Sequence, residues 1–98
     1  MTSVSFLSPA LAEIADAAAY YQSHAPEAAE GFFESLDAGV DLLANHPYAG
    51  RPTRFEARRL TLRKYPYDLV YRIYDEGVLV TAVAHHRRKP WYWADRMP

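Results

Sequence analysis

The stretch LVYRIYDEGVLVTAVA, residues 69–84, decides the fold. Its two halves, residues 69–74 and 78–84, are rich in the β-branched and aromatic residues that favour strands. Between them lies Asp75-Glu76-Gly77, a short turn in which Gly77 can adopt a positive φ at low cost. The stretch therefore predicts an antiparallel β-hairpin.

Shorter patterns extend the predicted sheet on the N-terminal side of this hairpin. Residues 58–65 alternate Leu60 and Leu62 with arginine and threonine, which is typical of a strand with a buried face and an open face that carries guanidinium groups. Residues 3–7 are partly β-branched and predict a first strand. Residues 47–52 are rich in proline and glycine and are interpreted as a turn-rich connection.

Two helices are predicted between the first strand and this connection. In the first, Ser8 is the expected N-cap, Pro9 takes the first helical position, and the helix should end near Ser23. Its helical spacing predicts a buried stripe opposite two acidic residues. The stripe comprises Leu11, Ile14, Ala15, Ala18 and Tyr21, and the acidic residues are Glu13 and Asp16.

The second helix should begin at Pro26 and stop before Pro47. Its apolar stripe consists of Phe32, Phe33, Leu36, Val40 and Leu43. Its acidic stripe, interpreted as a solvated face, consists of Glu27, Glu30, Glu34, Asp37 and Asp41. Gly31 and Gly39 each cost about 1 kcal/mol relative to alanine inside a helix, and close approach to the alanine-rich first helix would explain them.

These elements predict one α+β domain over residues 1–98. The helix hairpin should cover one face of a twisted, mainly antiparallel sheet in the order β-α-α-β-β-β, followed by a short C-terminal segment. The chain is half hydrophobic and has no cysteine, which fits a small core that needs no disulfide. Its apolar runs are far shorter than the roughly 20 residues that span a bilayer, and no Lys or Arg precedes Arg51 to begin a secretory signal. We therefore expect a soluble cytoplasmic protein that does not bind a membrane.

Charge is segregated along the chain, although the formal net charge is only −1. The first 50 residues contain seven acidic and no basic residues, whereas residues 51–98 contain all 11 lysines and arginines and five acidic residues. This asymmetry predicts an acidic face and a basic face, and the basic face could meet phosphate or an acidic partner. A segregated surface without any partner is the alternative.

The residue motifs argue against several kinds of chemistry. A zinc site is not expected, because cysteine is missing and His85 and His86 should point to opposite faces at a strand end. The serines lie outside any nucleophile-elbow pattern, and the four glycines are too far apart for a phosphate-binding loop. We therefore predict no metal and no cofactor.

The sequence HHRRKPWYW, residues 85–93, is a dense mixture of cations and aromatic rings. Such mixtures occur in nucleic-acid sites and in protein-binding hot spots, because arginine makes bidentate contacts and aromatic rings supply flat contact area. The alternative is that Trp91 and Trp93 fold back over the sheet as core cover, while the neighbouring cations remain solvated.

RNA cleavage through the 2′-hydroxyl would need an acid, a base and a cation that holds the scissile phosphate. His85 or His86 could carry protons near neutral pH, and Tyr92 could donate one. The arginines that could hold the phosphate are Arg59, Arg63, Arg72 and Arg88. A hydrogen-bonded structural role for the histidines is the competing interpretation.

Several segments, taken in order, resemble the RelE/ParE superfamily of toxins from bacterial type II toxin–antitoxin modules. The resemblance begins with Val4-Ser5-Phe6 before an alanine-rich helix and continues through residues 32–36, 43–47 and 58–60. It is most specific in YPYDLVYR, residues 65–72, and in VAHHRR, residues 83–88, followed by Pro90, Tyr92-Trp93 and Arg96.

The resemblance implies a helix hairpin on a twisted antiparallel sheet, and a small antitoxin that wraps the toxin in a hetero-oligomer. It also implies one of two activities: inhibition of DNA gyrase, as in ParE-like toxins linked to plasmid stabilisation and growth arrest, or cleavage of mRNA on the ribosome. Ribosome-dependent members are strongly basic, whereas this chain is weakly acidic. We therefore favour a gyrase inhibitor that is not an enzyme, and keep two alternatives: a ribosome-dependent endoribonuclease, and a degenerate toxin that only binds its antitoxin.

Two sets of site residues follow from these alternatives. The predicted contacts with gyrase or the antitoxin are Arg58, Arg59, Arg63, Arg72, Arg87, Arg88, Trp91, Tyr92 and Trp93. The predicted catalytic residues of a ribonuclease are His85, His86, Arg59, Arg63 and Tyr92.

Overall fold

The hairpin predicted from residues 69–84 forms the centre of the sheet in the computed structural model, which describes residues 1–96. β4 (Tyr67–Tyr74) and β5 (Gly77–His85) pair in antiparallel register. Gly77 has a φ of 144°, so the predicted positive φ at this turn is confirmed. Residues 97 and 98, the last two of the single domain expected over 1–98, lie outside the described residues.

Three further strands complete a five-stranded mixed sheet. β3 (Arg58–Thr61) pairs antiparallel with β4, and β2 (Arg51–Pro52) pairs antiparallel with β3. β1 (Val4–Phe6) runs parallel to β5, so the strand order is β1-β5-β4-β3-β2. The predicted α+β class is confirmed, and the element order becomes β-α-α-β-β-β-β.

Two predictions about the strands were wrong. The strand expected over residues 58–65 ends at Thr61, because Lys64 adopts a left-handed φ of 69° and the chain reverses there to enter β4. β2 was interpreted as part of a connection, because two residues are too few to show an alternating pattern.

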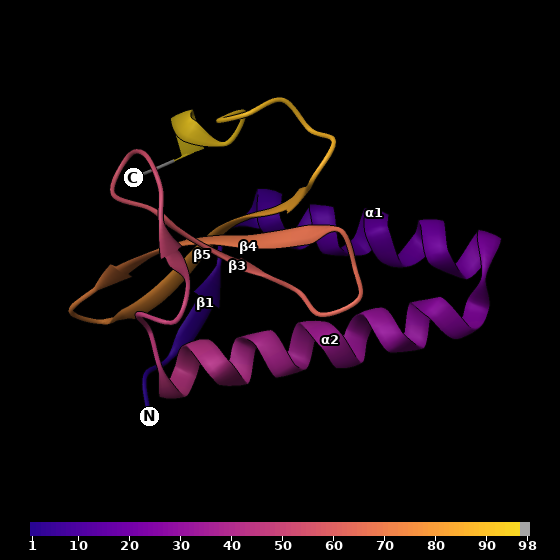
Figure 1. Cartoon of the computed structure of the whole chain (residues 1–98), viewed down its shortest axis with the longest axis horizontal. Coiled ribbons are helices and arrows are strands. Elements are labelled where there is room, and N and C mark those ends of the chain that lie inside the picture. The colour runs from indigo at the N-terminus through magenta and orange to yellow at the C-terminus, as the bar shows by residue number, and fades with distance from the viewer. Residues whose placement is uncertain (97–98) are drawn as a thin grey trace.

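α1 (Ser8–His24) and α2 (Pro26–Asn45) form a hairpin that packs against one face of the sheet (Figure 1). Each helix has proline in its first turn, as expected. The predicted N-cap at Ser8 was wrong, because the cap position is Leu7 and no side chain caps the helix. The acidic stripe of α2 is exposed throughout, which confirms that it is a solvated face. None of the helices in residues 1–96 has the length and apolarity needed to cross a membrane.

The buried face of α1 is rotated relative to the prediction. Ala10 and Ala17 are buried, whereas Leu11 and Ala15 are exposed. Alanine occurs on every side of this helix, so its sequence gives little contrast between a buried and a solvated face. As a result Glu13, which the pattern placed on the side away from the core, faces the edge of the sheet.

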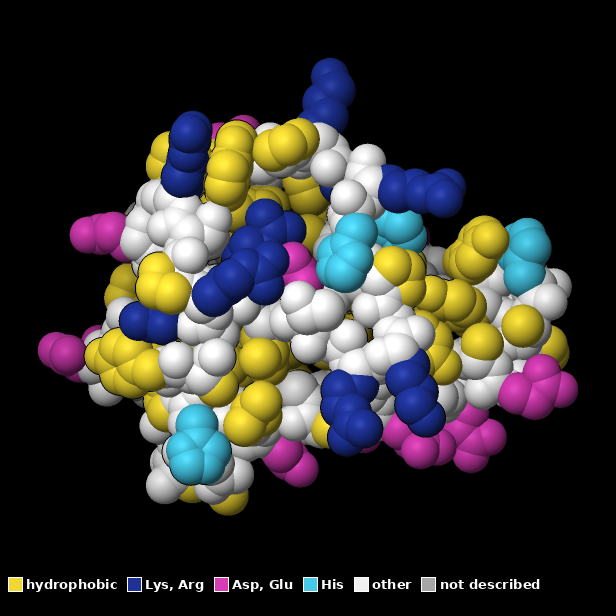
Figure 2. Space-filling view, viewed as in Figure 1, with side chains coloured by type: hydrophobic (Ala, Val, Ile, Leu, Met, Phe, Trp, Pro, Cys, Tyr) yellow, Lys and Arg dark blue, Asp and Glu magenta, His cyan; other side chains and the backbone are white. Residues whose placement is uncertain are grey.

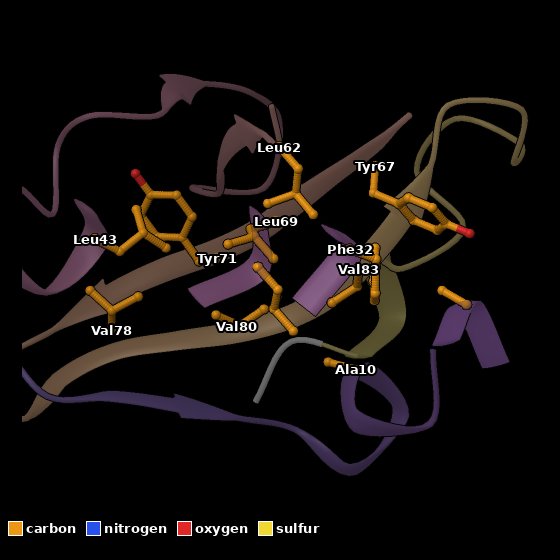
Figure 3. Packing of buried hydrophobic residues seen from close by; sticks show 12 residues of the cluster. Ala10, Phe32, Leu43, Leu62, Tyr67, Leu69, Tyr71, Val78, Val80 and Val83 are labelled. Atoms are coloured by element: carbon orange, nitrogen blue, oxygen red, sulfur yellow. The ribbon is translucent and has the colours of Figure 1, made fainter. Parts of the chain in front are cut away.

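The main core lies between the helix hairpin and the sheet. Figure 3 shows its side chains, which include Phe32, Leu43, Leu69, Tyr71, Val80 and Val83. Gly39 allows the sheet to approach α2, since a Cβ there would lie 3.1 Å from Leu62 and 3.2 Å from Leu69. Gly31 faces the Tyr65 hydroxyl in the same way. The glycines of α2 therefore make room for side chains of the sheet and its loops, and the predicted close approach to α1 was wrong.

A β-bulge gives the sheet a second apolar face. Val70 pairs with Ala82 and Tyr71 with Val80, so Thr81 is an extra residue in β5. The bulge shifts the alternation of β5 and turns Ala82 away from the helices, into a second cluster with Val70 and Trp93. The C-terminal segment, defined here as residues 86–96, crosses this second face (Figure 1).

Candidate functional site

The C-terminal segment is fixed to the sheet by Trp93, whose side chain is only 1% exposed. Trp93 packs on Val70 and Ala84, and the Trp91 ring meets it edge-on at a centroid distance of 5.9 Å. The core-cover interpretation is therefore correct for Trp93, and this burial leaves almost none of its surface for the predicted contact with a partner. Trp91 remains partly exposed.

Side chains close the edge of β5 where β1 ends. β1 pairs only with residues 78–80, so the later backbone groups of β5 have no strand on that side. Glu13 accepts a hydrogen bond from the Val83 N–H at 2.9 Å, and Arg96 donates one to the Thr81 carbonyl at 3.2 Å. A carboxylate and a guanidinium thus take the place of a strand at this edge.

Glu13 also binds three side chains of the C-terminal segment. Arg96 donates from Nη1 at 2.9 Å and from Nη2 at 3.1 Å, and the Tyr92 hydroxyl donates at 2.7 Å. Arg88 lies 3.9 Å from the carboxylate, and its guanidinium and that of Arg96 both lie over the Tyr92 ring. We call Glu13, Arg88, Tyr92 and Arg96 the Glu13 cluster; it connects α1 to the end of the chain.

The titration of this cluster follows from its contacts. Burial alone would raise the pKa of Glu13, but the hydrogen bonds from Arg96, Tyr92 and Val83 outweigh it, so this pKa is lowered. Burial and the bond to Glu13 raise the pKa of Tyr92 above its ordinary value. At neutral pH, Glu13 is therefore charged and the Tyr92 proton is directed at it.

A second carboxylate, Asp68, organises the open face of the sheet. It is 2% exposed and accepts hydrogen bonds from the Thr61 hydroxyl at 2.6 Å and from Arg59 Nε at 2.9 Å. His86 Nε2 lies 3.1 Å from its Oδ1, and Arg51 lies 3.8 Å away. Burial acts to raise the pKa of Asp68, but the bonds from Thr61, His86 and Arg59 prevail and lower it.

The two adjacent histidines have different surroundings. His85 meets the Tyr67 ring edge-on, and its Nδ1 accepts the Arg87 N–H at 3.0 Å, whereas His86 turns to Asp68. Burial and the neighbouring Arg87 charge lower the pKa of His85. Each histidine thus has a structural partner, which matches the competing interpretation of these residues.

Most of the predicted residues come together around one hollow of about 130 Å³. Its lining includes Arg59, His85, His86, Arg88, Trp91 and Tyr92. Arg63 lies beside α2 near Leu42, and Arg72 lines a different hollow with Tyr48 and Glu56, so neither belongs to this group. Within residues 1–96, no cluster of three or more His, Asp or Glu side chains could hold a metal ion.

Fewer arginines are open to a partner than the sequence predicts. Figure 2 shows Lys and Arg side chains in separate groups across this view. The arginines paired with carboxylates of the chain itself are Arg51, Arg59, Arg72, Arg88 and Arg96. Arg58 instead donates to the Gly50 and Tyr48 carbonyls. Among the predicted contact arginines, only the guanidinium groups of Arg63 and Arg87 form neither an ion pair nor a hydrogen bond with a residue in the described range.

Sequence reasoning missed four residues that shape this region. Glu13 and Asp68 hold the predicted cations and rings in place, and Arg54 and Phe55 lie beside Trp91. Glu13 could not be singled out because its partners are distant in sequence; Arg96 is 83 positions away. The nearest partners of Asp68, Thr61 and Arg59, meet it only through the pairing of β3 with β4. Phe55 carried a weak signal, as an aromatic residue between the predicted connection, residues 47–52, and the strand predicted from residue 58.

Comparison with solved structures identifies the class of fold. The chain matches a structure described as "Chromosomal ParDE TA system from P. aeruginosa" with a TM-score of 0.77, over 87% of this chain and 96% of the other. The two are 22% identical, so the match shows a shared fold.

The chain belongs to the family described as ParE toxin of type II toxin-antitoxin system, parDE, which matches residues 4–90. It is also 33% identical over 82 residues to a protein of Sinorhizobium fredii (strain NBRC 101917 / NGR234) named "Putative toxin Y4kP", covering 83% of this chain and 85% of the relative. These matches confirm the resemblance to the RelE/ParE superfamily and assign the chain to the ParE family within it.

Proposed function

We propose that this chain is a cytoplasmic toxin that arrests growth by inhibiting DNA gyrase, and that a cognate antitoxin neutralises it in a hetero-oligomer. Membership of the ParE family supports the toxin role. One observation favours gyrase over RNA: Tyr92, His86 and Arg59, three of the predicted catalytic groups, are each bound to a carboxylate of the chain itself.

These carboxylates oppose the chemistry of RNA cleavage. A scissile phosphate would compete with Asp68 for the Arg59 guanidinium and would meet a second negative charge at Glu13. The Tyr92 hydroxyl already donates to Glu13, and its raised pKa weakens it further as an acid. Arg63, the second arginine proposed to hold the phosphate, lies outside the hollow.

The ribonuclease alternative is supported by one feature of the structure. Arg59, His85, His86 and Tyr92 line the same hollow, so four of the five residues predicted for catalysis are neighbours. If this alternative is correct, exchange of His85 and His86 for glutamine should abolish cleavage and leave antitoxin binding intact.

A parallel assay of the two targets decides between the proposals. Purified toxin is added to gyrase, with supercoiling and trapped cleaved DNA as readouts, and to translating ribosomes, with mRNA integrity as the readout. We expect inhibited gyrase and intact mRNA. Codon-dependent cuts in mRNA together with unaffected gyrase would replace this proposal by the ribonuclease alternative.

The antitoxin is proposed to contribute an acidic segment that folds on binding. Arg63 and Arg87 are available to such a segment, and the exposed rings of Tyr20 and Tyr48 offer apolar area elsewhere on the surface. Expression of the toxin alone should arrest growth, and co-expression of its cognate antitoxin should restore growth. Normal growth during expression of the toxin alone would indicate a degenerate toxin that only binds its antitoxin.

A further inference from the structure

Residues 53–57 form a tight loop between β2 and β3 that lies against the C-terminal segment. The Thr53 N–H donates to the Ala57 carbonyl at 2.9 Å, and the Ala57 N–H donates to the Arg54 carbonyl at 3.2 Å. Ala57 itself is buried in the cluster around Trp93. Both ends of the loop are therefore fixed, and the position of its tip is defined by the sheet.

The tip of this loop has an unusual backbone. Phe55 and Glu56 adopt left-handed φ values of 62° and 58°, a conformation that side chains other than glycine, asparagine and aspartate disfavour. Of these two residues, Glu56 has a polar partner, because Arg72 donates a hydrogen bond to its carboxylate. Burial does not account for Phe55, which is 50% exposed. The Ala57 N–H bond to the Arg54 carbonyl closes a hairpin turn that needs a positive φ at both central positions, yet phenylalanine and glutamate stand where glycine, asparagine or aspartate is usual.

The strained conformation places Phe55 beside two tryptophans. Its ring meets Trp91 at 6.4 Å with an angle of 70°, and Trp93 at 6.1 Å with an angle of 90°. Arg54 lies over the Trp91 ring at 5.0 Å. We call Arg54, Phe55 and Trp91 the loop–tail patch. Figure 2 shows hydrophobic side chains next to Lys and Arg side chains over the C-terminal segment, at the top of the view.

We infer that the loop–tail patch is a contact surface for the protein target of the toxin, at a site on that target that combines apolar and acidic side chains. The inference rests on the proposed function and adds two residues, Arg54 and Phe55, that the sequence motifs did not indicate. Phenylalanine, tryptophan and arginine are enriched in protein interfaces, and tryptophan and arginine are also frequent among the residues that dominate the binding energy. Arg54, and the exposed Lys89 that lines the same hollow as Trp91, supply the positive charge that an acidic surface complements.

The ring geometry favours a protein over a single-stranded nucleic acid. Nucleic acids bind aromatic platforms whose faces are open for successive bases to stack. In the loop–tail patch the Phe55 ring stands at 70° to Trp91, and at 90° to the buried Trp93 beneath it, while Arg54 covers one face of Trp91. Phe55 and Trp91 thus form an apolar projection with the Arg54 cation beside it, which fits a pocket on a protein surface.

The test compares Phe55→Asn with Phe33→Ala in the full-length toxin. Asparagine tolerates the left-handed conformation, so Phe55→Asn removes the ring and keeps the backbone favourable. Phe33 is a matched control, because it is also a half-exposed phenylalanine, 45% against 50%, and lies on α2. Four quantities are measured for each variant: melting temperature, antitoxin binding, gyrase inhibition and growth arrest.

We expect Phe55→Asn to weaken gyrase inhibition and growth arrest by about tenfold or more, the loss of one dominant interface residue, with antitoxin binding unchanged. Its melting temperature should stay within a few degrees of that of the wild type, as should every property of the control. Full inhibition by Phe55→Asn, or loss of antitoxin binding alone, would overturn the inference. If the wild-type toxin does not inhibit gyrase, the proposed function fails separately, and growth arrest by Phe55→Asn still decides whether the patch contacts the true target.

Discussion

Replacing Glu13 by alanine is expected to destabilise the whole protein, although the residue lies on the surface side of a helix by its sequence pattern. The carboxylate accepts hydrogen bonds from the Val83 amide, the Tyr92 hydroxyl and both terminal nitrogens of Arg96. The substitution leaves these donors without an acceptor and removes the side chain that joins α1 to the C-terminal segment.

The magnitude follows from the burial of the two partners. Breaking one side of a buried ion pair costs about 3–5 kcal/mol. The Glu13 side chain is 13% exposed and that of Arg96 is 19% exposed, so water replaces some of the lost bonds. We therefore expect the free energy of unfolding to fall by about 3 kcal/mol. For a domain of this size, that corresponds to a loss of roughly 12–24 °C in melting temperature.

Thermal unfolding monitored by circular dichroism measures this loss, and hydrogen exchange of the Val83 amide reports on the cluster locally. Asp16→Ala is the control, because Asp16 is an exposed acidic residue of the same helix, and its melting temperature should barely change. A double-mutant cycle with Arg96→Ala should give a coupling energy of about 1–3 kcal/mol. A melting temperature of Glu13→Ala within 2 °C of the control would refute the reasoning.

Three further predictions concern stability. Trp93→Ala should lower the free energy of unfolding in urea by about 3–5 kcal/mol, because the indole is fully buried under the C-terminal segment. Gly77→Ala should lower it by more than about 1 kcal/mol, since φ is 144° and the new Cβ would lie 2.5 Å from the Ser3 carbonyl oxygen. The pKa values of Glu13 and Asp68 are lower in the folded state, so their contribution is complete above the unfolded values of about 4 and is lost as the pH falls through the folded ones. Urea titrations at a series of pH values should therefore show a steeper acid loss for the wild type than for Asp68→Asn.

Local patterns predicted the framework because each of its elements depends on neighbours in the sequence. The Asp75-Glu76-Gly77 turn joins β4 to β5 as expected, and the prolines at positions 9 and 26 stand in the first turns of α1 and α2. The same reasoning failed for the buried face of α1, where alanine on all sides removed the contrast on which a helical period depends.

The sequence predicted which residues form the candidate site, but not which of them would be buried or paired with a carboxylate. The cations and aromatic rings of residues 85–93 do gather with Arg59 around one hollow. The sequence could not show that Trp93 would be buried or that Arg59 would be paired with Asp68. Each of these states depends on which strands become neighbours.

By itself, the sequence determined the hairpin, the two helices, the division of charge between its halves and the likeness to ParE toxins. Turn residues, hydrophobic periodicity and motifs can all be recognised from residues that are close together in the sequence. Only the tertiary structure decided which charges remain open to a partner. Glu13 and Arg96 are 83 positions apart, and Phe55 and Trp91 meet across the open face of the sheet. Contacts of this kind form only when the sheet and the C-terminal segment pack together, so no local pattern contains them.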